Sequence, residues 1–251
     1  DVYMYYVAEN SAVDSNLKGD VTIEPMTKVT GSLTIITEDG NIYGYDLIVD
    51  GGKVTLFTNS FEKLVDGERV YDLNTDAVKD GKVNLNSIQA MNGADILIHA
   101  YGSIILDNRN NEATYQQTGE PLRKHVTNTF ENSNVQLVTE NGDFSSKELY
   151  VLDSDVTMDI VGDVSVHYIE NRDTGFTDED GNGADDDIST LIINAAGSIT
   201  VEDETGVRDI VTENAKTILT TVDGNVTANK FDSTGSEVII TTGSGNAQGN
   251  V

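Results

Sequence analysis

The residues best suited to chemistry form an acidic loop in the second half of the chain. Asp178, Asp180 and Asn182 stand at alternate positions, and Gly183 follows directly. Alternating oxygen ligands before a glycine are the first half of a calcium loop, because the oxygens converge on one hard cation and the glycine allows a sharp turn. This spacing therefore predicts a calcium site.

The second half of the calcium motif is altered. Ser189 stands at the twelfth position, where an acidic ligand is usual, so a nearby aspartate would have to replace it. No helical pattern flanks the loop, which argues against an ordinary EF-hand. Carboxylates this crowded repel one another without a cation, and the alternative is a solvated acidic loop. The expected calcium ligands are Asp178, Asp180, Asn182, Asp185 and Asp186.

A second group of carboxylates raises the possibility of an enzyme. Asp153, Asp155 and Asp159 are close in sequence, and two carboxylates at a suitable separation can act as acid and base on a polysaccharide. Such an enzyme would bring them together with Arg172 or Lys147. The remaining polar residues nearby are Asp163 and His167.

The histidines show no metal-binding pattern. His99, His125 and His167 are far apart and form no local ligand pair. His99 and His167 fall in strand patterns, where packed or surface positions are expected. His125 belongs to the basic cluster 123–125, which could contact an anionic partner or offset local acid.

A repeat of 24 residues must position all of these groups. Three copies, at 33–56, 135–158 and 217–240, share their internal spacing without insertions. Aligned on Gly40, Gly142 and Gly224, they carry apolar residues at +2, +7, +14 and +16. A fixed period of this length indicates stacked structural repeats.

Short alternating runs such as Val21–Ile23 indicate that each repeat consists of strands and turns. Equal offsets in distant copies favour a parallel β-helix (β-solenoid) over a sandwich or barrel, which would show irregular spacing. We therefore expect one all-β domain over 1–251, with on the order of ten rungs and a length of about 50 Å. Loop excursions are predicted near 60–80 and 107–134; they either bind a partner or have no role.

The repeat also weighs against catalysis. The positions of Asp153, Asp155 and Asp159 are occupied by unrelated residues in the other copies, which is typical of surface variation. In a chain with 43 acidic residues, such clusters arise by chance. We therefore expect no enzyme and assign no catalytic residue.

Composition excludes several classes of partner. The net charge of −28 repels phosphate backbones and anionic membranes, so neither nucleic acid nor membrane insertion is expected. No apolar run approaches the roughly 18 residues of a membrane helix. Cysteine is absent, so stability must come from stacking or ions. The chain opens at Asp1 without an initiator methionine or export signal, and we expect a fragment of a longer protein.

The strand strings resemble those of filamentous-haemagglutinin-type bacterial surface adhesins. The strings are GSLTIITEDGNIYG, GSIILDN, GDVSVHYIE, GSITVEDE and DGNVTANK, and they cover most of the chain outside the two excursions. The resemblance implies a right-handed parallel β-helix in a long exported fibre. It also implies an extracellular location, on the bacterial surface or secreted, and no catalytic residues.

The predicted function is therefore adhesion, or support of an adhesive tip, by a surface or secreted bacterial protein that calcium stabilises. Its expected partners are glycans or proteins of host or neighbouring bacterial cells. The alternatives are a polysaccharide-active β-helix enzyme and a spacer that binds nothing.

Overall fold

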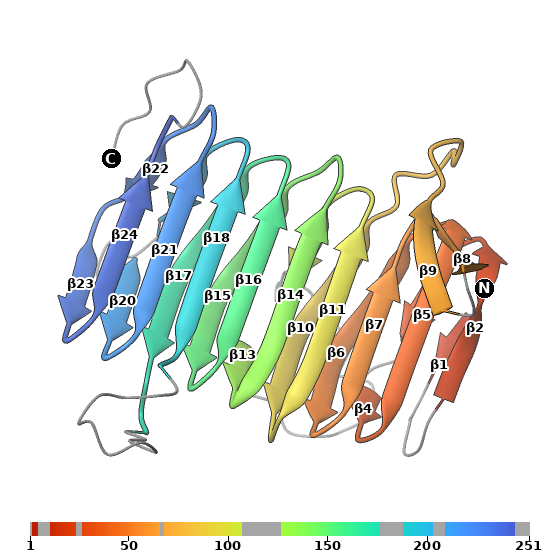
Figure 1. The fold of residues 1–251 in the computed structure, drawn as a ribbon, viewed down its shortest axis with the longest axis horizontal. Helices are drawn as coiled ribbons and strands as arrows, with labels where there is room; N and C mark the ends of the chain where they lie inside the picture. The colour runs from red at the N-terminus through yellow and green to blue at the C-terminus, as the bar shows by residue number, and fades with distance from the viewer. Residues whose placement is uncertain are drawn as a thin grey trace, which may run out of the picture.

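A computed structural model describes residues 2–4, 11–23, 27–65, 68–106, 127–175, 188–202 and 209–243. The regular structure in these ranges is β-strand, arranged in two long parallel sheets and one hairpin (Figure 1). No helix in the same ranges is long and apolar enough to cross a membrane. The all-β class and the parallel strands predicted from the sequence are confirmed.

Sheet B is the nine-stranded sheet, and its strands pair in chain order. They are β2 (Ser11–Lys18), β5 (Ser32–Asp39), β7 (Lys53–Phe57), β11 (Ala94–Ala100), β14 (Ser133–Thr139), β16 (Asp155–Ile160), β18 (Thr190–Ala195), β21 (Lys216–Thr221) and β24 (Glu237–Thr241). Between each two of them the chain passes through the other sheet. One sheet-A segment and the sheet-B strand that follows it are called a coil below.

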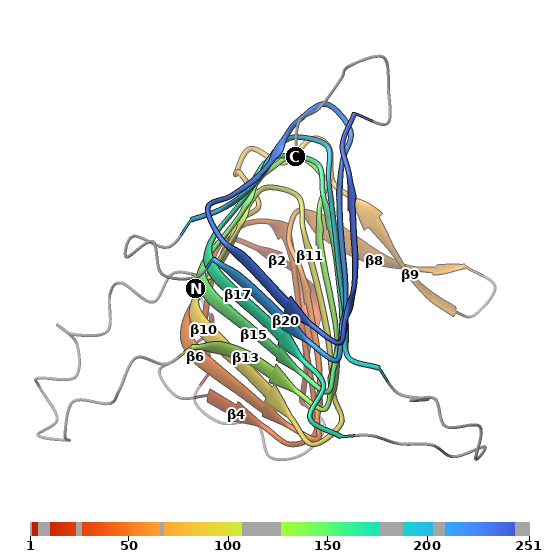
Figure 2. The ribbon, with the colours of Figure 1, turned by 90° about the vertical axis from the view of Figure 1, so that its left-hand side faces the viewer.

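Sheet A has thirteen strands. They are β1 (Val2–Met4), β3 (Val21–Ile23), β4 (Thr27–Val29), β6 (Ile42–Asp50), β10 (Val83–Met91), β12 (Ile104–Leu106), β13 (Asn128–Glu131), β15 (Phe144–Leu152), β17 (Val164–Arg172), β19 (Ile199–Val201), β20 (Ile210–Glu213), β22 (Val226–Ala228) and β23 (Phe231–Thr234). The start of β10 pairs with β12 and its end with β13, so sheet A has two halves. Viewed along the stack, these halves and sheet B outline a triangle (Figure 2).

The core is a narrow ribbon between the sheets. In strands such as β11, β14 and β18 alternate side chains are buried, and identical positions of successive coils stack in register. One column in sheet A contains Ile42, Val83, Ile104, Phe144, Val164, Ile199 and Val226. Each of these side chains is at most 6% exposed. Parallel strands with such buried apolar columns derive most of their stability from the stacking of neighbours.

The three sequence copies are equivalent in space. Val54, Val156 and Val238 share the +14 position, and they lie in one register row of sheet B, each on the second residue of its strand. The predicted alignment therefore corresponds to physical stacking. The nine described strands of sheet B span about 40 Å at ~4.8 Å per strand, less than the predicted 50 Å. The stack is shorter than predicted because insertions between the strands use residues without adding coils.

The two expected excursions differ in what the structure shows. The first contains an antiparallel hairpin of β8 (Ser60–Val65) and β9 (Glu68–Leu73), outside both parallel sheets. Figure 2 shows this hairpin projecting from the side of sheet B. Of the second excursion, 107–126 lies outside the described residues. Its last part, 128–134, lies in β13 and at the start of β14.

Candidate functional site

A column of glycines forms the corner where sheet-B strands end, along the upper edge of Figure 1. The glycine amide of one coil donates to the glycine carbonyl of the preceding coil, as for Gly162 to Gly142 at 3.0 Å and Gly197 to Gly162 at 3.1 Å. In the three sequence copies, a threonine hydroxyl also closes the corner onto a glycine carbonyl at 2.8 Å. These pairs are Thr37 with Gly40, Thr139 with Gly142 and Thr221 with Gly224.

After several of these glycines, the next residue links the coils through its side chain. Asp143 accepts the amide of Asp163 at 2.8 Å, and Asp163 accepts the amide of Ser198 at 2.7 Å. The hydroxyl of Ser103 accepts the amide of Asp143 in the same way, at 3.1 Å. These bonds explain why Gly-Asp and Gly-Ser pairs begin the strands. They satisfy corner amides that no strand partner reaches.

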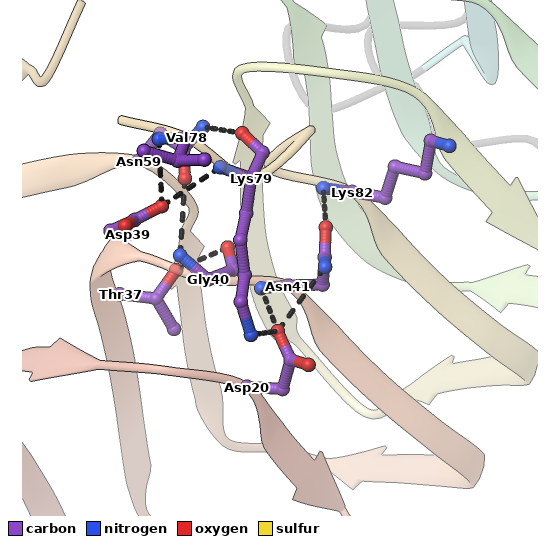
Figure 3. Close-up of polar contacts among 9 residues, drawn as sticks. All are labelled: Asp20, Thr37, Asp39, Gly40, Asn41, Asn59, Val78, Lys79 and Lys82. Carbon is purple, nitrogen blue, oxygen red and sulfur yellow. Dashed lines mark hydrogen bonds and ion pairs between the residues drawn. The ribbon is translucent and has the colours of Figure 1, made fainter. Parts of the chain in front are cut away.

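The hairpin is fixed to this corner by a polar network (Figure 3). Asp39 accepts the amides of Val78 at 3.0 Å and Lys79 at 2.9 Å, where the chain returns from the hairpin. Asn59 donates to the carbonyl of Lys79 at 2.7 Å and accepts the amide of Gly40 at 3.2 Å. The two ends of the hairpin insertion, at Asn59 and at residues 78–79, are thus bound to the same glycine corner.

Electrostatics add to this anchor. The Lys79 ammonium lies 2.9 Å from Asp20. Partial burial raises the pKa of Asp20, but hydrogen bonds from Asn41 and the contact with Lys79 outweigh it and hold this pKa below its ordinary value. A lowered carboxyl pKa contributes stability that is present above about pH 4 and is lost as the pH falls further.

The substitution Lys79→Ala is therefore expected to loosen the hairpin root at neutral pH. An exposed ion pair of this kind contributes at most about 1 kcal/mol, so amide exchange at positions 78 and 79 should rise by up to roughly fivefold. As the pH falls through the lowered pKa of Asp20, the wild type and the variant should converge, because protonation of Asp20 removes the ion pair. Lys82→Ala, which removes the exposed pair with Asp80, is the control. Equal exchange in the two variants would contradict the anchor.

Aromatic packing holds the hairpin against sheet B. The rings of Phe57 and Tyr71 stack with centroids 4.4 Å apart, and His99 packs on Phe57 at 5.3 Å. This explains why Phe57, on the outward side of β7, is only 5% exposed. The Nε2 atom of His99 also contacts Glu140 at 2.6 Å. His99 is therefore a packing residue, as expected.

The opposite corner, where sheet A passes to sheet B, is a stack of tight turns. Asn92, Asn132, Asp153 and Asn214 occupy it with φ between 46° and 57°, a conformation that asparagine and aspartate tolerate better than most residues. Their backbone amides form hydrogen bonds to neighbouring coils; the amide of Asn132, for example, donates to the carbonyl of Leu152 at 2.9 Å. Serine hydroxyls accept further turn amides, as Ser154 does from Ser133 at 3.0 Å.

This corner carries the candidate binding groove, a concavity of about 990 Å³. It runs across the starts of β11, β14, β16, β18 and β21, along the lower edge of Figure 1. Its walls are mainly carboxylates, amides and hydroxyls. Representative lining residues are Asn92, Asp95, Glu131, Asn132, Asn134 and Asp155.

Three side chains of the groove are available to a ligand. Within the described ranges, Glu131, Asn132 and Asp155 have no side-chain hydrogen-bond or ion-pair partner. By contrast, Asp95 is paired with Lys53 at 2.7 Å and accepts a hydrogen bond from the side-chain amide of Asn134 at 3.3 Å. The groove therefore combines satisfied supporting groups with unsatisfied ones that face solvent.

The expected calcium ligands, Asp178, Asp180, Asn182, Asp185 and Asp186, lie outside the described residues. The residues that flank their loop are described and fixed. One carboxylate, Asp173, accepts the amides of Gly175 at 2.9 Å and Ser189 at 3.0 Å, on the two sides of the loop. Gly175 also borders the groove. Among the described residues, no group of three acidic, histidine or cysteine side chains could hold a metal ion.

The carboxylates considered for catalysis are only partly brought together. Asp153 and Asp155 both line the groove, but Asp153 accepts the amide of Thr174 at 2.6 Å. Asp159 stands four residues beyond Asp155 on the same strand, which separates their backbones by about 13 Å. Its carboxylate accepts a hydrogen bond from the side-chain amide of Asn194. This separation exceeds the roughly 5–9.5 Å between the carboxyl groups of glycosidases.

The basic side chains predicted to assist them are placed or paired differently. Arg172, at the end of β17, pairs with Glu170 and Glu213 at 3.1 Å each. Lys147 and His167 occupy matching positions of β15 and β17 in sheet A. Asp163 belongs to the glycine-corner ladder, and His125 lies outside the described residues.

Sequence reasoning missed both the corner threonines and the groove. The threonines had a signal, since each stands three residues before the aligned glycine. The groove residues had none, because Asp155 comes from a different coil than Glu131 and Asn132. No family model, curated protein or solved structure matches the chain.

Proposed function

We propose that the chain is a right-handed parallel β-helix that serves as a structural and adhesive segment of a bacterial surface or secreted adhesin. The support for the helix is the strict alternation between two parallel sheets, each gaining strands coil by coil. Parallel strands in one sheet are connected in the right-handed sense in about 98% of cases, which favours this hand. Such a fold extends a protein along one axis, as an adhesive fibre requires.

The observation that best supports adhesion is the polar groove on the outer surface of the stacked coils. The interior columns consist mainly of buried apolar side chains, with a few buried polar ones such as Asn128, so we expect a partner to bind the outer surface. The groove offers unpaired carboxylate and amide groups there. Glycans or proteins of host or neighbouring bacterial cells are the proposed partners, and no catalytic residue is assigned.

We also propose that calcium binds the loop whose two ends are joined by hydrogen bonds to Asp173. If the expected ligands bind calcium, the ion stabilises the folded state by mass action. At 100 times the dissociation constant this amounts to about 2.7 kcal/mol, or roughly 5–10 °C for a chain of this size. Chelation should lower the melting temperature by that amount, and added calcium should restore it. Magnesium at equal ionic strength is the control; an identical melt with and without chelator contradicts a calcium site.

The function is tested by measuring attachment of the labelled chain to bacterial cells, epithelial cells and immobilised glycoproteins, with and without calcium. Saturable attachment is the expected result. Absence of attachment to every surface would favour the spacer. Release of sugar fragments would favour the enzyme and contradict adhesion.

A further inference from the structure

We propose that the groove binds an uncharged, hydroxyl-rich chain, a neutral oligosaccharide, laid across successive coils. This assignment rests on the proposed adhesive function and names its ligand class and site. Glu131, Asn132 and Asp155, which have no described side-chain partners, are the central contacts.

Recognition in this groove has to proceed through side chains. The turn amides that border it are already used between coils, as Gly93 donates to the carbonyl of Asn132 at 2.7 Å and Asp153 to that of Arg172 at 3.1 Å. A peptide that bound by strand addition would need free backbone groups at a sheet edge. The groove instead presents carboxylate and amide oxygens, which are acceptors for hydroxyl donors.

The charges in the groove select against other ligands. The groove carboxylates repel sulfated or carboxylated sugars, and the net charge of −28 adds to this. Lys216, which also lines the groove, is already paired with Glu237 at 2.9 Å. A basic peptide would find only the Glu131 and Asp155 carboxylates unpaired, because Asp95 is already paired with Lys53 and the Asp153 carboxylate with Thr174.

The spacing of the groups fits a long, thin ligand. Asp95, Asn134, Asp155 and Thr190 occupy one register row of sheet B, on four consecutive strands. Neighbours in this row are about 4.8 Å apart along the stacking direction. A sugar chain parallel to this direction would meet a new polar side chain at each strand.

The experiment uses the full chain and its double variant Glu131→Ala/Asp155→Ala. Binding of cellohexaose, maltohexaose and mannohexaose is measured by calorimetry, with a hyaluronan hexasaccharide and octalysine as the anionic and cationic probes. Both substituted residues are exposed, so the fold should be retained. The matched control is Asp76→Ala/Asp223→Ala, which removes the same charge from exposed sites outside the groove.

We expect at least one neutral hexasaccharide to bind, with affinity lowered by tenfold or more in the groove variant, because each hydrogen bond to a charged group contributes about 1.5–3 kcal/mol. The control variant should bind like the wild type, and salt should have little effect. Binding of octalysine alone, or equal neutral-sugar affinity in both variants, would overturn the groove assignment. If no hexasaccharide binds while the chain attaches to cells, the ligand class is wrong and adhesion stands. If nothing binds at all, both proposals fail.

Discussion

Replacing Gly142 by alanine is expected to lower the melting temperature by roughly 6–12 °C, which corresponds to a loss of about 3 kcal/mol. A Cβ atom at this position would lie 2.5 Å from both the carbonyl carbon of Gly102 and the amide nitrogen of Ser103. Both are backbone atoms of the neighbouring coil, so no flexible side chain can move aside. The coils would have to separate locally, which weakens the bond from Gly162 to Gly142 as well.

The matched control is Gly175→Ala. Nothing lies within 4 Å of a Cβ atom at Gly175, and its backbone is not in the left-handed region. This change should leave the melting temperature within about 2 °C of the wild type. Gly93→Ala separates strain from clash, because Gly93 has open space but a φ of 80°. An intermediate loss of about 1 kcal/mol is expected there. Equal melting of all three variants would refute the stacked corner.

The glycine column also shows why so much of the fold could be predicted. Gly40, Gly142 and Gly224 recur at fixed offsets because each must stack on the backbone of a neighbouring coil. The requirement is local in each repeat, so it leaves a regular trace in the sequence. The same holds for buried valines such as Val54 and Val156, which share one register row. Because the coils stack in register, a contact that each coil must make recurs at a regular interval in the sequence.

Other features leave no such trace. The groove depends on Asp95, Glu131 and Asp155 meeting across three coils, and their spacing in the chain is set by insertions that follow no period. The β8–β9 hairpin pairs antiparallel while every other described strand pair is parallel, because it is an insertion outside the two stacked sheets. Its attachment through Asp39 and Asn59 uses residues that look like ordinary turn formers in the sequence.

Asn128 illustrates a buried polar residue that only the structure identifies. It stands at the start of β13, where the chain re-enters sheet A, and its side chain is fully buried. Its amide oxygen accepts the backbone amide of Ile88 at 2.9 Å. Its amide nitrogen donates to the carbonyl of Leu106 at 3.3 Å and to the hydroxyl of Ser146 at 2.9 Å. One side chain thus joins three coils.

The substitution Asn128→Ala is expected to destabilise the protein by about 3 kcal/mol, because buried partners lose their hydrogen bonds and a small cavity remains. Chemical denaturation with urea at neutral pH measures this loss. Thr129→Ala, on the adjacent half-buried position of β13, should cost less than about 1 kcal/mol. Similar costs for the two variants would show that the network of Asn128 adds little.

The substitution Asn128→Asp tests the same network through pH. An aspartate keeps the shape and can still accept from Ile88, but only its protonated form can donate to Leu106 or Ser146. Burial also disfavours the charge, so the pKa of this new carboxyl should be raised in the folded state. The variant should therefore approach wild-type stability below about pH 4 and fall behind as the pH rises through that folded pKa. Asn141→Asp adds the same charge at an exposed turn and should differ from the wild type by a constant amount across this range. Parallel pH curves for the two aspartate variants would mean that position 128 is not part of a buried hydrogen-bond network.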